Sequence, residues 1–194
     1  VAEPLKYVHR NVTLLKGEAL CGEGNEIAHS EGPLGRRDGP VGNAYAGAIA
    51  NQKDLLNNFE GIEAPNFSSL LPTAFITKVK ADTLFRAVLH FGPVQAAVGA
   101  AVNDCVEANY FDDEVIDHCC FVLTPFVHPH AAEDENGKPL DTESEKYKAA
   151  CHRLYCYTYM TVVAVLHEIA TGGLNREEFY AARKKLSPHP FRGF

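Results

Sequence analysis

The chain reads Cys119-Cys120-Phe121-Val122-Leu123-Thr124-Pro125-Phe126-Val127 a little past its middle. This run is almost continuously apolar, and it lacks the alternation of polar and apolar residues that is typical of a strand with one solvent-exposed face. Strands that are covered on both faces have such a pattern. The run therefore predicts a β-strand that other parts of the chain bury on both sides.

The segments on its N-terminal side predict further strands. A loose alternation over Asn11–Cys21 leads into a polar, glycine-rich turn that ends at Glu26, and Ile27–His29 begins a second strand. Gly32–Gly42 is rich in glycine and proline and predicts a loop, with a helix following over Ala44–Asn51. Thr73–Val79 has the period of a strand and puts Lys78 on a face with apolar neighbours.

Two helices are expected before the central strand. Asp82 is a plausible N-cap for a short helix that ends at Gly92-Pro93. Pro93 then starts a second helix with a buried stripe at helical spacing, formed by Val94, Ala97, Val98, Ala101, Val102, Cys105 and Val106. The acidic stretch from Asp112 to Asp117 predicts a solvated loop.

Two more helices are expected after the central strand. Ala131–Lys148 is charged and predicts an excursion on the surface. A long helix over Glu145–Thr171 would end at the Gly172-Gly173 C-cap, and a last helix would run to Lys185 from a capping box. Because we find no internal repeat and no linker, the expected architecture is one α+β domain over residues 1–194.

Composition narrows the class of partner. The chain has 194 residues, 46% of them hydrophobic, and a formal net charge of -7, which repels polyphosphate. We therefore expect a small-molecule substrate and no nucleic acid. No apolar run approaches the roughly 20 residues of a membrane span, so no membrane is expected either.

The six cysteines contain no CxxC pair and predict free thiols in a reducing compartment. A metal site built from Cys119, Cys120, His128 and His130 is the alternative, although these residues lack the usual spacing of zinc ligands.

Several short sequence motifs indicate the function more specifically than the composition does. They are Gly17-Glu18-Ala19-Leu20-Cys21-Gly22-Glu23-Gly24-Asn25-Glu26-Ile27-Ala28-His29, Ala64-Pro65-Asn66, Lys78-Val79, Phe91-Gly92-Pro93-Val94-Gln95, Phe126-Val127-His128 and His189-Pro190-Phe191. Together they resemble the formaldehyde-activating enzyme family over roughly residues 16 to 191. Residues 1–15 and the excursion at 131–148 exceed the usual length of that family.

The resemblance implies a fold similar to the second domain of ribosomal protein S5, assembled as a homopentamer with the site in a cleft between subunits. The implied reaction, of the hydro-lyase type, condenses formaldehyde with the co-substrate tetrahydromethanopterin to give the methylene adduct and water, without a metal or redox cofactor. Members of the family work in the cytoplasm of methylotrophs and methanogens.

The resemblance also implies roles for particular residues. His29 matches the proposed general acid of the family, and a histidine can deliver a proton near neutral pH. Lys78 and Gln95 match substrate-binding residues. Taken without the resemblance, His29 could serve only to satisfy a buried carbonyl, Lys78 could reach solvent along its strand, and Gln95 could cap a helix.

Three substrate-binding positions depart from the family pattern. Glu31 stands where the family has an aspartate and could still orient the histidine. Glu60 and Lys80 stand where the family has leucine and threonine, and they predict an ion pair because buried charges are costly unless paired. The alternative function is therefore a homologue that binds a different pterin, amine carrier or aldehyde without the reaction. A metal-dependent hydrolase using His128, His130 and Cys119 is a third hypothesis.

Overall fold

The computed structural model describes residues 14–50, 58–172 and 176–185. Within them, one main sheet has the strand order β1-β2-β7-β6-β3, and β4 and β5 pair separately. The strands are β1 (Leu15–Cys21), β2 (Ala28–Arg36), β3 (Asn58–Glu60), β4 (Ile62–Ala64), β5 (Phe67–Ser68), β6 (Thr73–Ile76) and β7 (Cys119–Val127). The helices are η1 (Gly24–Glu26), α1 (Pro40–Ala50), α2 (Leu84–Leu89), η2 (His90–Val94), α3 (Gln95–Glu107), α4 (Asp113–His118), α5 (Glu145–Ala170) and α6 (Arg176–Lys185).

The prediction for β7 is confirmed. The strand spans Cys119–Val127, pairs antiparallel with β2 and parallel with β6, and is buried over most of its length. Its fully buried side chains include Phe121 and Leu123. One α+β domain with a mixed sheet is therefore the observed architecture, as expected.

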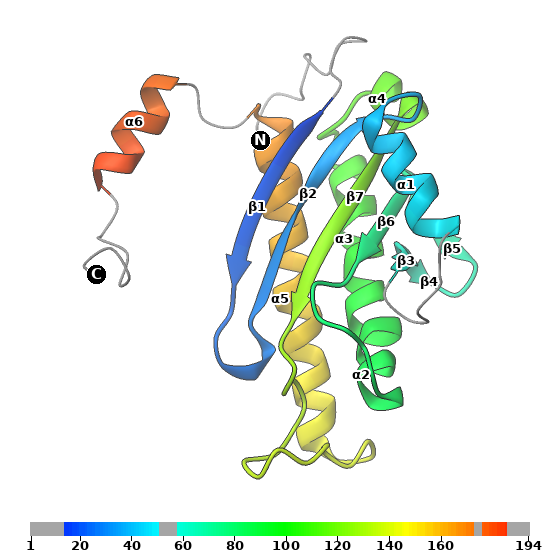
Figure 1. The fold of residues 1–194 in the computed structure, drawn as a ribbon, viewed down its shortest axis with the longest axis vertical. Helices are drawn as coiled ribbons and strands as arrows, with labels where there is room; N and C mark the ends of the chain where they lie inside the picture. The colour runs from blue at the N-terminus through cyan, green and yellow to red at the C-terminus, as the bar shows by residue number, and fades with distance from the viewer. Residues whose placement is uncertain (1–13, 51–57, 173–175, 186–194) are drawn as a thin grey trace.

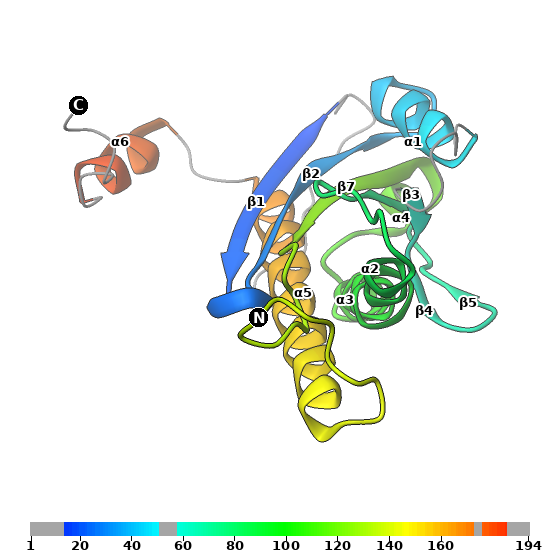
Figure 2. The ribbon, with the colours of Figure 1, turned by 60° about the horizontal axis from the view of Figure 1, so that its bottom comes forward.

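The two faces of the sheet are covered differently (Figures 1 and 2). The long helix α5 and the α2–α3 segment lie against one face, whereas α1 covers only part of the other, over β7 and its neighbours. Side chains from the first face, α3 and α5 form the main core, and Val41, Cys120 and Val122 form a small cluster under α1. The opposite face of β1 and β2 is left accessible, and it carries the residues discussed below.

The segment Gly32–Gly42 corrects our expectation of a loop, since β2 continues to Arg36 and α1 begins at Pro40. Gly32 lies inside the strand because the β7 backbone leaves no room for a side chain at this position. A Cβ at this position would collide with the Val122 carbonyl oxygen of β7. The strand expected over Thr73–Val79 is shorter than predicted, because β6 ends at Ile76.

The expected break at Gly92-Pro93 is also wrong. Pro93 lies inside the π-helical turn η2, which joins α2 to α3 without interruption. A wider turn tolerates proline because it avoids the clash with the carbonyl oxygen one turn back. The resulting helix, Leu84–Glu107, is long and apolar enough to cross a membrane by length and composition alone. Many of its apolar side chains, among them Leu89, Val98 and Val102, belong to the main core, whereas Leu84, Val88 and Phe91 are exposed.

Three helix boundaries follow from capping residues. Thr83, rather than Asp82, caps α2, since its side chain accepts a hydrogen bond from Arg86 N. Asp112 caps α4, a helix where we expected a loop, and Val115 of that helix is buried. Gly172, with a φ of 76°, follows α5 as predicted. The remaining parts of the C-terminal predictions, Gly173, Asn175 and the 189–191 string, lie outside the described residues.

Candidate functional site

His29 lies on the accessible face of β2. Side chains alternate between the faces of a strand, and Ser30, the next residue, bonds Thr161 of α5 across a buried 2.9 Å contact. His29 and Glu31 therefore point away from α5. The imidazole of His29 is 27% exposed, so it is accessible to a small molecule while its position is fixed by neighbours.

Four charged or titratable side chains form one hydrogen-bonded chain on this face, which we call the His29 chain. Its members are Glu18, His29, Lys78 and Glu31. Glu18 Oε1 lies 2.6 Å from His29 Nε2, Lys78 Nζ lies 2.8 Å from His29 Nδ1, and Lys78 Nζ lies 2.7 Å from Glu31 Oε1. Lys78 is 49 positions from His29 in the sequence, and the sheet brings the two into contact.

The partners of His29 assign the proton on its ring. An ammonium group can only donate, so Nδ1 accepts from Lys78 and the neutral ring carries its hydrogen on Nε2. Nε2 then donates to the Glu18 carboxylate. The carboxylate in direct contact with His29 is therefore Glu18, whereas Glu31, which we expected to orient the histidine, binds Lys78.

Lys78 also offsets the repulsion between two carboxylates in the sheet. Glu18 and Glu31 are direct partners across β1 and β2, and like charges at such positions repel. The Lys78 ammonium, through its hydrogen bond, lowers the pKa of the Glu31 carboxyl below its ordinary value. The Lys78 backbone N–H donates to Pro125 O, which holds this residue beside β7 after β6 has ended.

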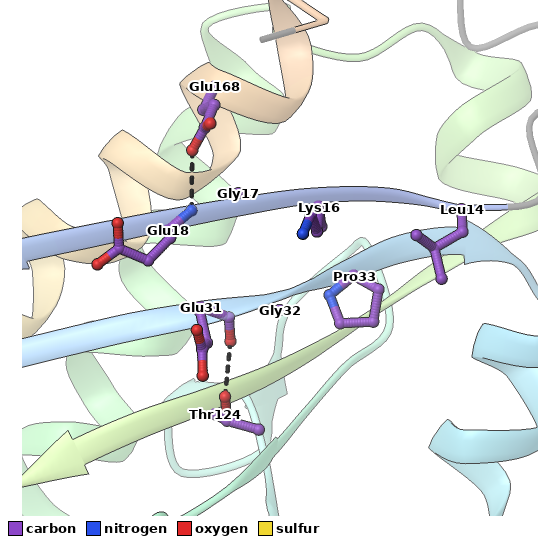
Figure 3. Close-up of a pocket in the computed structure, with 9 residues that line it drawn as sticks. All are labelled: Leu14, Lys16, Gly17, Glu18, Glu31, Gly32, Pro33, Thr124 and Glu168. Carbon is purple, nitrogen blue, oxygen red and sulfur yellow. Dashed lines mark hydrogen bonds between the residues drawn. The ribbon is translucent and has the colours of Figure 1, made fainter. Parts of the chain in front are cut away.

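A hollow of about 530 Å³ adjoins the His29 chain (Figure 3). Its lining comes from β1, β2, β7 and the end of α5, and consists of Leu14, Lys16, Gly17, Glu18, Glu31, Gly32, Pro33, Thr124 and Glu168. Glu18 and Glu31 connect this hollow to His29 because both belong to the lining and to the His29 chain. A molecule bound here would meet three carboxylates and the Lys16 ammonium.

Two of the other predicted substrate-binding residues, Gln95 and Glu60, contact each other rather than His29. Gln95 Nε2 donates to the Glu60 backbone carbonyl at 3.0 Å, and Glu60 Oε1 accepts from Tyr45 at 3.2 Å. Lys80 is exposed and makes no ion pair with Glu60 in the described part of the chain. Three strand spacings separate β2 from β3, which is about 14 Å. Glu60 and Gln95 thus form a second group beyond direct reach of His29 within one chain.

The residues of the metal alternative do not come together. Cys119 and Cys120 begin β7, while His128 follows its other end and His130 bonds Glu133. Among the residues that the structure describes, no group of three histidine, cysteine or acidic side chains could hold a metal ion. The described cysteines are all free, and burial raises the pKa of the Cys120 thiol to about 11.

Sequence reasoning missed Glu18 and Glu168 as members of the site. Glu18 lies in the string that carries the resemblance, but its contact with His29 depends on the pairing register of β1 and β2. Glu168 accepts from the Glu18 backbone N–H at 2.8 Å, across 150 positions of sequence. Only an acidic residue at a helix end marked it in the sequence, and that signal is too common to be useful.

Comparison with known proteins identifies the family. The sequence model of the formaldehyde-activating enzyme (Fae) family matches residues 16–168. A bifunctional enzyme Fae/Hps of Methanoregula boonei is 33% identical over 180 residues, which are 93% of this chain and 41% of that protein. Another of Archaeoglobus fulgidus is 34% identical over 177 residues, or 91% of this chain and 40% of that protein. The chain spans about two fifths of the length of these relatives. Because the family match covers well over half of its residues, the chain belongs to the formaldehyde-activating enzyme family.

Proposed function

We propose that the chain condenses formaldehyde with tetrahydromethanopterin, or a related reduced pterin, to form the methylene adduct and water. This is a lyase reaction of one-carbon metabolism, and we propose that it takes place in the cytoplasm. The observation that carries the proposal is the His29 chain, in which a histidine is hydrogen-bonded on both ring nitrogens beside a hollow. Family membership supplies the substrate class.

The reaction needs an acid at one particular atom. A pterin amine adds to formaldehyde, its proton moves to the former carbonyl oxygen, and a carbinolamine results. The C–O bond of the carbinolamine breaks only when its hydroxyl takes up a proton and leaves as water. A second amine of the same pterin then closes the methylene bridge and releases a proton. His29 donates the proton that the carbinolamine hydroxyl takes up, and it regains the proton that the second amine releases. A positioned general acid accelerates such a reaction roughly 10²–10⁴-fold.

The remaining predicted residues position the substrate. Lys78, with its ammonium against His29, can hold the carbinolamine oxygen, and Glu31 keeps Lys78 in place. We propose that Gln95, Glu60 and Lys80 contact the pterin. Since the strand that carries Glu60 lies about 14 Å from the strand that carries His29, and Gln95 bonds Glu60, this role fits a cleft between two copies of a homopentamer, and we propose that assembly.

A second candidate is a homologue that binds a pterin, another amine carrier or an aldehyde without turnover. It rests on Gln95 and Glu60. The Gln95 amide is already engaged by a backbone carbonyl, and Glu60 brings a carboxylate to a position where the family has leucine. A charge there favours a ligand of different polarity.

The test mixes purified protein, formaldehyde and tetrahydromethanopterin and follows the absorbance of the pterin as the adduct forms. We expect acceleration over the spontaneous reaction, and His29→Ala should remove most of it. His118→Ala is the matched control, because this histidine is exposed at the far end of β7. No acceleration by the wild type refutes the proposed reaction. Calorimetric binding of the pterin without turnover would establish the second candidate instead.

A further inference from the structure

We propose that Glu18 is the positioning residue of His29, anchoring Nε2 so that the ring delivers its proton from Nδ1. The inference rests on the proposed function for its catalytic meaning, but its geometry stands independently. Glu18 matches none of the site residues expected from the family resemblance. The contact of 2.6 Å between its Oε1 and His29 Nε2 is the shortest in the His29 chain.

The backbone of Glu18 is held in place although its side chain is 58% exposed. Its N–H points outward from the edge strand β1 and donates to Glu168 Oε2 of α5 at 2.8 Å (Figure 3). Gly17 permits this approach, since a Cβ there would lie 2.6 Å from the Val165 carbonyl oxygen. The edge strand β1, which pairs with β2 and packs against α5, is thus also hydrogen-bonded to α5 at the residue that binds His29.

The surroundings of His29 give the two ring nitrogens different tasks. The charged groups that face the ring are Glu18 from β1, Glu31 from β2 and Lys78 from the segment after β6. Phe126, its partner on β7, is uncharged. Among the described residues, Glu18 is the one anion that contacts the ring, so it stabilises the imidazolium, whereas Lys78 opposes it. The protonated ring therefore keeps Nε2–H on Glu18. Because Nδ1–H and the Lys78 ammonium are both donors, protonation breaks their contact, Lys78 stays paired with Glu31, and Nδ1–H is left to donate to the substrate oxygen.

This arrangement specifies the path of the proton. The Nδ1–H bond of the imidazolium breaks as the carbinolamine hydroxyl gains its hydrogen, and the C–O bond breaks to release water. The proton later lost by the second amine returns to Nδ1. Through both transfers Nε2–H remains on Glu18, which holds the ring orientation in the way that a carboxylate holds the histidine of a hydrolytic triad.

The experiment uses the full chain with ¹⁵N-labelled histidine and needs no substrate. Ring ¹⁵N shifts should show Nε2–H in the neutral form of His29. At a fixed pH near neutrality, Glu18→Gln should lower the ratio of protonated to neutral ring about threefold, as expected for loss of a partly exposed ion pair. Glu18→Asp keeps the charge but shortens the reach, so it should restore part of that ratio. Glu23→Gln is the matched control, because Glu23 is exposed on the same hairpin and its side chain makes no capping bond.

The rate measurement supplies the second readout. In the pterin assay, Glu18→Gln should lower kcat, move the rate–pH profile to lower pH and leave KM for the pterin nearly unchanged. A neutral ring with its hydrogen on Nδ1, or an unchanged protonation ratio in Glu18→Gln, overturns the inference. If the wild type fails to accelerate the reaction, the proposed function is refuted while the ring measurement still decides the role of Glu18. Thermal melting of each variant confirms that it is folded.

Discussion

Replacing Gly17 by alanine should destabilise the protein by separating β1 from α5. The new Cβ would lie 2.6 Å from Val165 O, and ordinary contact begins at 3.4 Å, so the two elements must move apart by 3.4 − 2.6 = 0.8 Å. The same movement would stretch the 2.8 Å bond from Glu18 N to Glu168 Oε2 to about 3.6 Å, beyond hydrogen-bond range.

The cost follows from these two effects. Loss of a hydrogen bond to a charged group costs about 1.5 kcal/mol, and the residual strain adds about 1 kcal/mol. A total of about 2.5 kcal/mol should lower the melting temperature of a chain of this size by about 5–10 °C.

Gly47→Ala provides the matched control. It makes the same chemical change inside α1, where no atom of the described residues lies within 4 Å of the added Cβ. Alanine is the better helix former by roughly 0.5–1 kcal/mol, so this variant should be slightly more stable than the wild type. Urea denaturation followed by circular dichroism measures both variants. If Gly17→Ala unfolds at the same urea concentration as the wild type, the claimed approach of β1 to α5 is wrong.

Three further predictions concern single contacts. Ser30→Ala removes the buried bond to Thr161 and should cost about 1 kcal/mol in urea denaturation, since Thr161 keeps its second bond. Lys78→Met should lower the unfolding free energy at pH 7 by under about 1 kcal/mol. Lys78 lowers the pKa of Glu31 in the folded protein, so the ion pair is lost as Glu31 becomes protonated. The difference in unfolding free energy between wild type and variant should therefore shrink as the pH falls below about 4.5 and through the lower folded-state pKa. A constant difference down to pH 3 would contradict the ion pair. Finally, burial raises the pKa of Cys120 to about 11, so a thiol reagent at pH 8 should modify it only after denaturation, as mass spectrometry of native and unfolded protein can establish.

Local signals in the sequence predicted the elements that depend on neighbours along the chain. The apolar run of β7, the stripe of α3 and the glycine that follows α5 all lie where they were expected. Predictions failed where tertiary contacts outweigh local preference. Gly32 continues a strand because β7 approaches its backbone closely, Pro33 follows it in the pairing with β1, and Pro93 stays inside a helix because a π-helical turn accommodates it.

The candidate site divides in the same way. The sequence alone identified His29 and Lys78 by resemblance, and it determined the kind of chemistry they could supply. It did not determine which carboxylate binds the imidazole, because Glu18 and Glu31 are both near His29 in the sequence and equally charged. The register that pairs Glu18 with Glu31, together with the end of β6 that brings Lys78 between Glu31 and the ring, decided this. A one-residue shift of that register would turn Glu18 to the opposite face. Register is set by the turn and by packing across the whole sheet, and so only the tertiary structure could assign the partners of His29.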